Sequence, residues 1–183
     1  MADKHLITRR DALRISAGIV AFLAVPVWAR PQAAKKPIFD VRDFGATGDG
    51  TTLDTNAIQR AINEASVAGK GAQVLLRGGK RYLIGALQLK GGIDFHLADD
   101  AELLVSADPT HYAGEAAITA LNAHGIRITG TGTINGRSSE FMEKYDEKDE
   151  WWIPKAFRPR LLALTGCNDL ELRDVTFLQA PLT

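Results

Sequence analysis

This sequence of 183 residues has few cysteines, no excess of basic charge and no regular glycine repeat. Each of these absences excludes a class of protein. There is one cysteine, Cys167, so the chain can form neither an intrachain disulfide nor a zinc site built on several cysteines. There is no surplus of basic charge, because 22 lysines and arginines balance 22 aspartates and glutamates, and a nucleic-acid surface would need such a surplus. The 17 glycines follow no three-residue period, which excludes collagen.

Long apolar runs are also missing, and the only stretch that approaches one lies near the start. Basic residues precede apolar residues 15–28, and Ala29 follows at a position that suits signal-peptidase cleavage. The pair Arg9-Arg10 resembles a twin-arginine export signal. A transmembrane anchor is the alternative, but it would need about 20 apolar residues. We therefore predict a signal peptide over residues 1–29, recognised by the export machinery and cleaved near Ala29, and then a linker over 30–37. The protein would be periplasmic or secreted, with no stable membrane anchor after cleavage.

One helix is predicted in the rest of the chain, from about residue 56 to residue 66. Its apolar positions form a single stripe, and Asp54 or Thr55 is placed to cap its first turn. Gly69 and Gly71 follow and are expected to end it. The apolar stripe consists of Ala57, Ile58, Ala61, Ile62 and Ala65.

After the helix the pattern changes to short apolar strands separated by tight turns. We expect strands at residues 73–76, 82–84, 87–89, 93–97 and 102–105. Five apolar pairs then recur at one offset of 44 residues: Ile118 and Leu162, Ala120 and Leu164, Ile126 and Leu170, Ile128 and Leu172, Ile134 and Leu178. A constant strand pattern with variable insertions is typical of a solenoid. A β-sandwich is the alternative, but it would need more hairpin turns than the single Asn135-Gly136. The prediction is an all-β solenoid whose one helix plugs the first coil.

Several segments of the chain also carry a family resemblance. They are Phe39 to Ala46, Gly48 to Gly50, Asp54 to Ile62, Gly130 to Gly136, Trp151-Trp152, Arg158 to Leu161 and Cys167 to Leu170. In this order they resemble glycoside hydrolase family 28, the polygalacturonases and rhamnogalacturonases, over about residues 38 to 181. The resemblance implies a right-handed parallel β-helix over residues 38–183. It also implies a galacturonate-containing pectic polysaccharide as substrate, hydrolysed with inversion.

The same resemblance limits what this chain can do alone. The family's three catalytic aspartates, its histidine and its Arg/Lys pair lie in motifs that follow the segments matched here. We therefore expect no catalytic residue in this chain, which would be the inactive, poorly folding N-terminal part of a longer enzyme. Two alternatives stay open: a β-helix lyase, which would use a basic residue to abstract a proton, and a non-catalytic carbohydrate-binding or structural module.

Four residues are candidates for binding substrate: Trp151, Trp152, Arg158 and Arg160. Tryptophan can stack on a sugar ring, or it can instead fix a loop to the β-helix wall, and arginine can hold a uronate carboxylate in a bidentate fork. Asp99-Asp100 and His124-Gly125 are interpreted as turns. The acidic stretch from Glu140 to Glu150 is interpreted as a solvated loop, since it lacks the glycine of a calcium-binding EF-hand. We predict no metal and no other cofactor.

Overall fold

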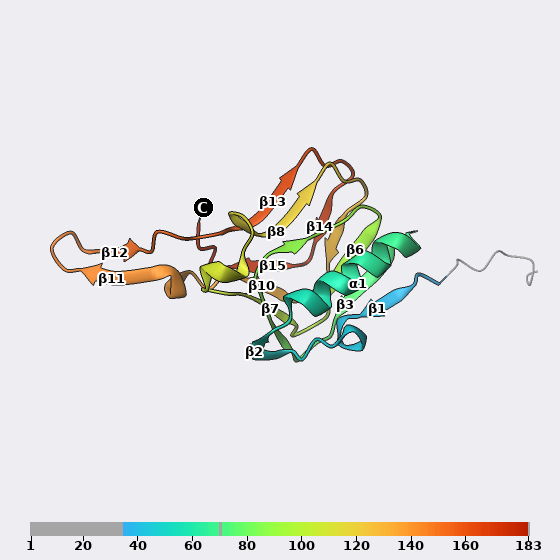
Figure 1. Cartoon of the computed structure of the whole chain (residues 1–183), viewed down its shortest axis with the longest axis horizontal. Coiled ribbons are helices and arrows are strands. Elements are labelled where there is room, and N and C mark those ends of the chain that lie inside the picture. Colours follow the sequence, from blue (N-terminus) through green and yellow to red (C-terminus); the bar gives the residue numbers. More distant parts are fainter. Residues whose placement is uncertain (1–34, 70, 183) are drawn as a thin grey trace, which may run out of the picture. The chain divides into compact units, whose positions relative to one another are not determined.

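The computed structural model describes residues 35–69 and 71–182 (Figure 1). The predicted signal peptide, with Arg9, Arg10 and Ala29, lies outside these residues and stays a prediction. In the described part no helix is both long and apolar enough to cross a membrane. The helical segments are η2 (Val41–Phe44), α1 (Thr55–Ala68), η3 (Pro109–His111) and η4 (Ser138–Phe141). The strands are β1 (Ile38–Asp40), β2 (Asp49–Leu53), β3 (Ala72–Leu76), β4 (Arg81–Ile84), β5 (Leu87–Gln88), β6 (Ile93–Leu97), β7 (Glu102–Val105), β8 (Ala116–Leu121), β9 (Arg127–Thr129), β10 (Thr133–Asn135), β11 (Met142–Asp146), β12 (Trp151–Pro154), β13 (Arg160–Thr165), β14 (Glu171–Arg173) and β15 (Thr176–Leu178).

The strands form three parallel sheets that the chain visits in rotation. Sheet 1 has the order β1-β3-β6-β9-β14, sheet 2 the order β15-β10-β7-β4-β2, and sheet 3 the order β13-β8-β5. From β3 onward the chain passes from sheet 1 to sheet 2 to sheet 3 and back to sheet 1, so each circuit adds one strand to every sheet. This is the coil of a parallel β-helix, and it confirms the predicted fold class. Among the described strands only β11 and β12 depart from it, pairing antiparallel as a hairpin.

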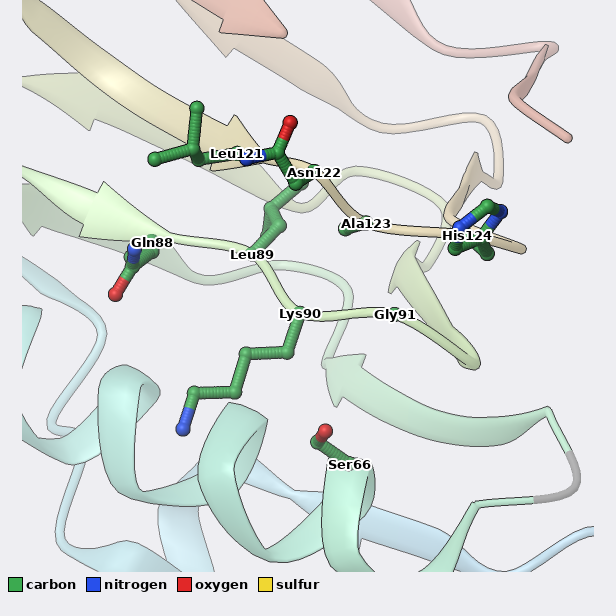
Figure 2. A pocket seen from close by; sticks show the side chains of 9 residues that line it. All are labelled: Ser66, Gln88, Leu89, Lys90, Gly91, Leu121, Asn122, Ala123 and His124. Atoms are coloured by element: carbon green, nitrogen blue, oxygen red, sulfur yellow. The ribbon is translucent and has the colours of Figure 1, made fainter. Parts of the chain in front are cut away.

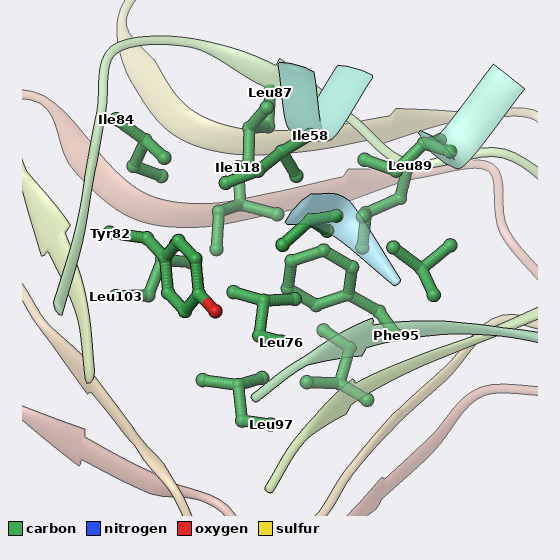
Figure 3. Packing of buried hydrophobic residues seen from close by; sticks show 14 of the residues in the cluster. Ile58, Leu76, Tyr82, Ile84, Leu87, Leu89, Phe95, Leu97, Leu103 and Ile118 are labelled. Atoms are coloured by element: carbon green, nitrogen blue, oxygen red, sulfur yellow. The ribbon is translucent and has the colours of Figure 1, made fainter. Parts of the chain in front are cut away.

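The core lies inside the coils, where one side chain of each strand stacks on its counterpart in the next coil. Val74, Phe95 and Ile128 form such a stack on sheet 1, and all three are fully buried. Leu87 and Ile118 continue the core from sheet 3 (Figure 3). Because every inward position is aliphatic or aromatic, the coils bury a continuous apolar interior.

Helix α1 closes the first coil, as predicted, and all five residues of its apolar stripe are buried. Asp54 occupies the N-cap position, one of the two predicted, but its side chain makes no hydrogen bond to the helix. Its carboxylate instead accepts hydrogen bonds from the backbone N–H groups of Thr47 and Gly48, at 2.7 and 3.0 Å. The hydroxyl of Thr55 accepts one from Gly85 N at 2.8 Å, so both residues tie α1 to neighbouring loops.

The predicted repeat is correct except in its last pair. Leu162 lies opposite Ile118, and Leu172 lies opposite Ile128, both at the expected offset of 44. Ile134, however, pairs with Phe177 rather than with Leu178. The reason is the turn from sheet 1 to sheet 2, which has three residues between β9 and β10 and two between β14 and β15.

The last described strands of the three sheets, β13, β14 and β15, each have a strand neighbour on one side only. Apolar side chains are exposed on these strands and the turn before β14: Leu170, Leu172, Phe177 and Leu178, each about 40 to 46% exposed. Cys167 lies in the same coil and is half-buried. Within the described residues this end of the β-helix has no covering layer.

The buried carboxylate of Asp40 gives stability a pH dependence. It accepts hydrogen bonds from Arg77 Nε at 2.6 Å and from Arg42 Nη2 at 3.0 Å. Burial raises the pKa of Asp40, but these hydrogen bonds outweigh burial and lower the pKa from its usual 3.8 to about 2. A carboxyl with a depressed pKa stabilises the fold above its unfolded pKa and loses that effect as the pH falls through its folded pKa.

We therefore expect the free energy of unfolding to fall between about pH 4 and pH 2 by about 1–2 kcal/mol more in the native protein than in Asp40→Asn. Urea titrations of both proteins at several pH values measure the difference. Equal pH profiles would show that Asp40 is not held by the two arginines.

Candidate functional site

A groove with a mixed polar and apolar lining follows the outer face of sheet 3, beside helix α1. It consists of two adjoining hollows of about 450 and 560 Å³, which share Gln88 and Lys90. The smaller is lined by Ser66, Gln88, Leu89, Lys90, Gly91, Leu121, Asn122, Ala123 and His124 (Figure 2). The larger is lined by Gln59, Asn63, Ala86, Leu87, Gln88, Lys90, Ala113, Gly114, Ala116 and Thr119. We call this surface the sheet 3 groove.

The geometry of the groove follows from the way α1 meets β5. Gln88 N donates to Gln59 Oε1 at 2.8 Å, and Gln59 Nε2 donates to Gln88 O at 3.0 Å. The Gln59 side chain thus takes the place of a neighbouring strand, because it pairs with both the N–H and the C=O group of Gln88 at the edge of β5. Gln88 and Thr119 lie opposite each other in register, so their side chains form an outward row across β5 and β8. This row is the floor of the groove.

The groove has the electrostatics of a site for an anion. None of the residues that line either hollow is a carboxylate, whereas Lys90 belongs to both. Lys90 is exposed, and Figure 2 shows its side chain reaching toward α1. His124 lies at the other side of the hollow, 3.4 Å from Asn168 through its Nδ1. Amides, hydroxyls and one free-standing ammonium can bind a carboxylate-bearing sugar, but they include no pair of acids for hydrolysis.

Sequence reasoning missed this groove, although its signal was present. The sequence predicts a strand at residues 87–89, and Gln59 lies outside the apolar stripe of the predicted helix. The sequence does not show that Gln88 of this strand and Gln59 of the helix contact each other. That contact follows from the way the first coils fold against α1.

The four residues predicted to bind substrate do not converge on one site. Trp151 and Trp152 lie on β12, where they are 53% and 57% exposed. Trp152 lines a separate hollow. Arg158 lies between β12 and β13, while Arg160 opens β13 with Nη1 3.7 Å from a carboxylate oxygen of Glu115. Their role in binding stays a prediction.

The predicted solvated loop, Glu140 to Glu150, is mostly exposed as expected. It also contains strand β11 and the turn of the β11–β12 hairpin, regular structure that the sequence did not predict. Tyr145 pairs with Trp152 across the two strands, and their rings meet edge to face with centroids 5.5 Å apart. Phe141 is fully buried at the base of the hairpin and is the aromatic residue that fixes it to the β-helix. The exposed tryptophans do not serve as that anchor.

Other clusters of reactive residue types have structural roles. Asp99-Asp100 forms the predicted turn between β6 and β7, with Asp100 at a φ of 59°. Ser106 Oγ lies 2.8 Å from His111 Nδ1, but Ser106 is 4% exposed and its hydroxyl also accepts from Asp108 N. It serves a loop network and is closed to substrate. Within residues 35–69 and 71–182 no group of three or more potential ligands is placed to hold a metal ion.

Comparison with known proteins gives three kinds of match. The family model for the pectate lyase-like domain of rhamnogalacturonase A and epimerase matches residues 38–97. A probable polygalacturonase of Arabidopsis thaliana is 31% identical over 148 residues, covering 78% of this chain and 30% of the relative. A family 28 exopolygalacturonase of Yersinia enterocolitica is 27% identical with a TM-score of 0.62, covering 80% of this chain and 35% of that one. An exopolygalacturonase of Thermotoga maritima superposes with a TM-score of 0.68 at 21% identity, covering 84% of this chain and 44% of that one.

The fold and these matches define the class: the chain is a right-handed, pectin-lyase-like parallel β-helix. More narrowly, it has the fold of the polygalacturonases of glycoside hydrolase family 28. The chain spans about a third of the length of the curated relatives that it matches.

Proposed function

We propose that this chain forms the N-terminal coils of a pectin-degrading glycoside hydrolase and that its sheet 3 groove holds galacturonate residues of the substrate. The observation that carries the proposal is the groove itself: two joined hollows without a lining carboxylate and with Lys90 in both. A polygalacturonate chain carries one carboxylate per sugar, so each ring crossing the groove would bring a negative charge to this ammonium. Gln88 and Thr119 offer hydrogen-bonding partners for the ring hydroxyls.

In the proposed reaction, one carboxylic acid protonates the leaving oxygen and a second carboxylate activates water, with inversion at the anomeric carbon. Those carboxylates are not in the groove described here. Its contribution is to bind and orient the polymer, which lowers the entropic cost of the reaction at neighbouring coils. We accordingly expect the chain alone to release no reducing ends from polygalacturonate.

The groove can be tested by binding. Replacing Lys90 with glutamine should weaken the binding of a galacturonate tetramer by about tenfold at low salt, because a charge-assisted contact is lost. The affinity of the native protein should fall as salt is added, and that of the variant should change less. Isothermal titration measures both.

Lys148→Gln is the matched control, since this lysine lies in the exposed hairpin turn away from the groove residues. Equal losses for the two variants would show non-specific attraction and contradict the proposal. Turnover of polygalacturonate by the chain alone would contradict the assignment of a binding role. Galacturonate binding without turnover in any longer form of the protein would favour the alternative of a non-catalytic carbohydrate-binding module.

A further inference from the structure

A separate hollow lies at the base of the β11–β12 hairpin and has a different chemical character from the sheet 3 groove. Its volume is about 330 Å³, and it is lined by Ser138, Ser139, Met142 and Trp152. This volume is at the lower end of the range for small-ligand sites, enough for one or two sugar rings. An exposed indole beside two hydroxyls offers an apolar face and hydrogen-bonding groups, which are the two things that a pyranose ring needs.

The hollow is held in shape by groups around it. Tyr145 meets Trp152 edge to face and restricts the indole on one side. Lys155 N donates to Phe141 O at 2.8 Å and closes the base of the hairpin, while Phe141 is fully buried. Among residues 35–69 and 71–182, no hydrogen bond occupies the hydroxyl of Ser138 or Ser139. Both hydroxyls are therefore available to a ligand.

The charge around the hollow disfavours a uronate. Hairpin residues 142–154 carry five carboxylates against two lysines. Two cations flank the hairpin in sequence, one paired with a carboxylate and one bonded to a backbone carbonyl, and the net charge of residues 137–155 stays negative. Arg137 Nη2 lies 3.2 Å from Glu140 Oε1, and Lys155 Nζ donates to Glu140 O at 2.8 Å. An anionic sugar would meet like charge here, with no free cation among the lining residues.

We propose that Trp152, with Ser138 and Ser139, forms a binding site for a neutral hexopyranose, distinct from the groove that takes galacturonate. The indole would stack on the apolar face of the ring, and the two hydroxyls would bond to its edge. The site would select neutral glycan by repelling uronates as well as by attracting its own ligand. The proposal does not depend on the groove of sheet 3, because the two surfaces share no lining residue.

The test compares two tryptophans that follow each other in sequence. Successive residues of a strand point to opposite faces, so Trp151 presents its ring away from the hollow with similar exposure. We expect Trp152→Ala to weaken binding of a neutral β-galactotetraose by about tenfold or more, as truncation of a central aromatic contact does. Trp151→Ala should leave the affinity within about twofold. The full chain is titrated with the sugar while the indole N–H signals are followed by NMR.

The two proposed sites can fail separately. Lys90→Gln should leave galactotetraose binding unchanged, and Trp152→Ala should leave galacturonate binding unchanged. Loss of neutral-sugar binding in Ser138→Ala would support the hydrogen bonds that we assign, and retained affinity would remove that residue from the site.

Four outcomes would overturn the proposal: no saturable binding of the neutral tetramer, equal losses in the two tryptophan variants, tighter binding of the galacturonate tetramer at Trp152, or a Trp152-dependent dimer in sedimentation. The last would assign the surface to a second copy of the chain.

Discussion

Replacing Phe95 with alanine is expected to lower the free energy of unfolding by about 3–5 kcal/mol. Phe95 lies at the centre of β6 and is fully buried, stacked between Val74 and Ile128 of the adjoining coils. Removing the ring leaves a cavity between two coils whose backbones are held at fixed spacing by the ladder of sheet 1. The cavity can collapse only by breaking strand pairing, so the cost should fall in the upper part of that range.

Urea unfolding of the full chain, followed by circular dichroism, measures this loss. Phe95→Leu keeps most of the volume and should cost about 1–2 kcal/mol, so it gives a value even if the alanine variant does not fold. Gln73→Ala, on the outer face of the neighbouring strand β3, should change stability by less than about 0.5 kcal/mol. A Phe95→Ala loss below about 1 kcal/mol would contradict the tightly packed interior.

The sequence predicts the coils well because their signal is local and repeated. Strands β6 and β7 have the predicted bounds, and α1 differs by one residue at its start and two at its end. Each coil must place apolar residues inward at a fixed spacing, so the pattern survives even where insertions vary. The prediction paired Leu178 with Ile134 because the turn before β15 is one residue shorter than the turn before β10. The apolar pattern cannot reveal this difference, since Phe177 and Leu178 are both apolar.

Three strands, β2, β11 and β12, were missed because none of them buries a face. The β11 sequence, Met142 to Asp146, is mostly charged, and β2, Asp49 to Leu53, is mostly polar and exposed. Such strands bury few side chains and give no hydrophobic alternation. The same limit applies to the sites. The sequence predicts a binding role for Trp152, but it cannot show that Ser138 and Met142 adjoin this residue. Ser138 lies in the short η4, and the mostly charged β11 has no apolar period from which its position could be inferred.

Gly130→Ala is expected to destabilise the protein by more than about 3 kcal/mol, or to prevent folding, through the close approach of two coils. Gly130 lies in the turn between β9 and β10 with a φ of 104°, which an L-residue with a side chain rarely adopts. A β-carbon there would overlap the carbonyl oxygen of Leu97 and lie 2.7 Å from its carbonyl carbon. Both are backbone atoms of the preceding coil, so neither can move without shifting that coil. The Leu97 carbonyl also accepts a hydrogen bond from Gly132 N, which the shift would break.

Substitutions at two other glycines distinguish the cost of backbone strain from the cost of steric overlap between the coils. Gly92 has a φ of 74° with open space around its Cα, so Gly92→Ala should cost only the backbone strain of about 1–2 kcal/mol. Gly114 also has open space, and its φ is not positive, so Gly114→Ala should be neutral or slightly stabilising by reducing the freedom of the unfolded chain. Thermal and urea unfolding of the three variants should therefore rank Gly114→Ala above Gly92→Ala and both well above Gly130→Ala. If Gly130→Ala and Gly92→Ala lost equal stability, backbone strain alone would account for the glycine, and the contact between the coils at Leu97 would not be as close as the structure has it.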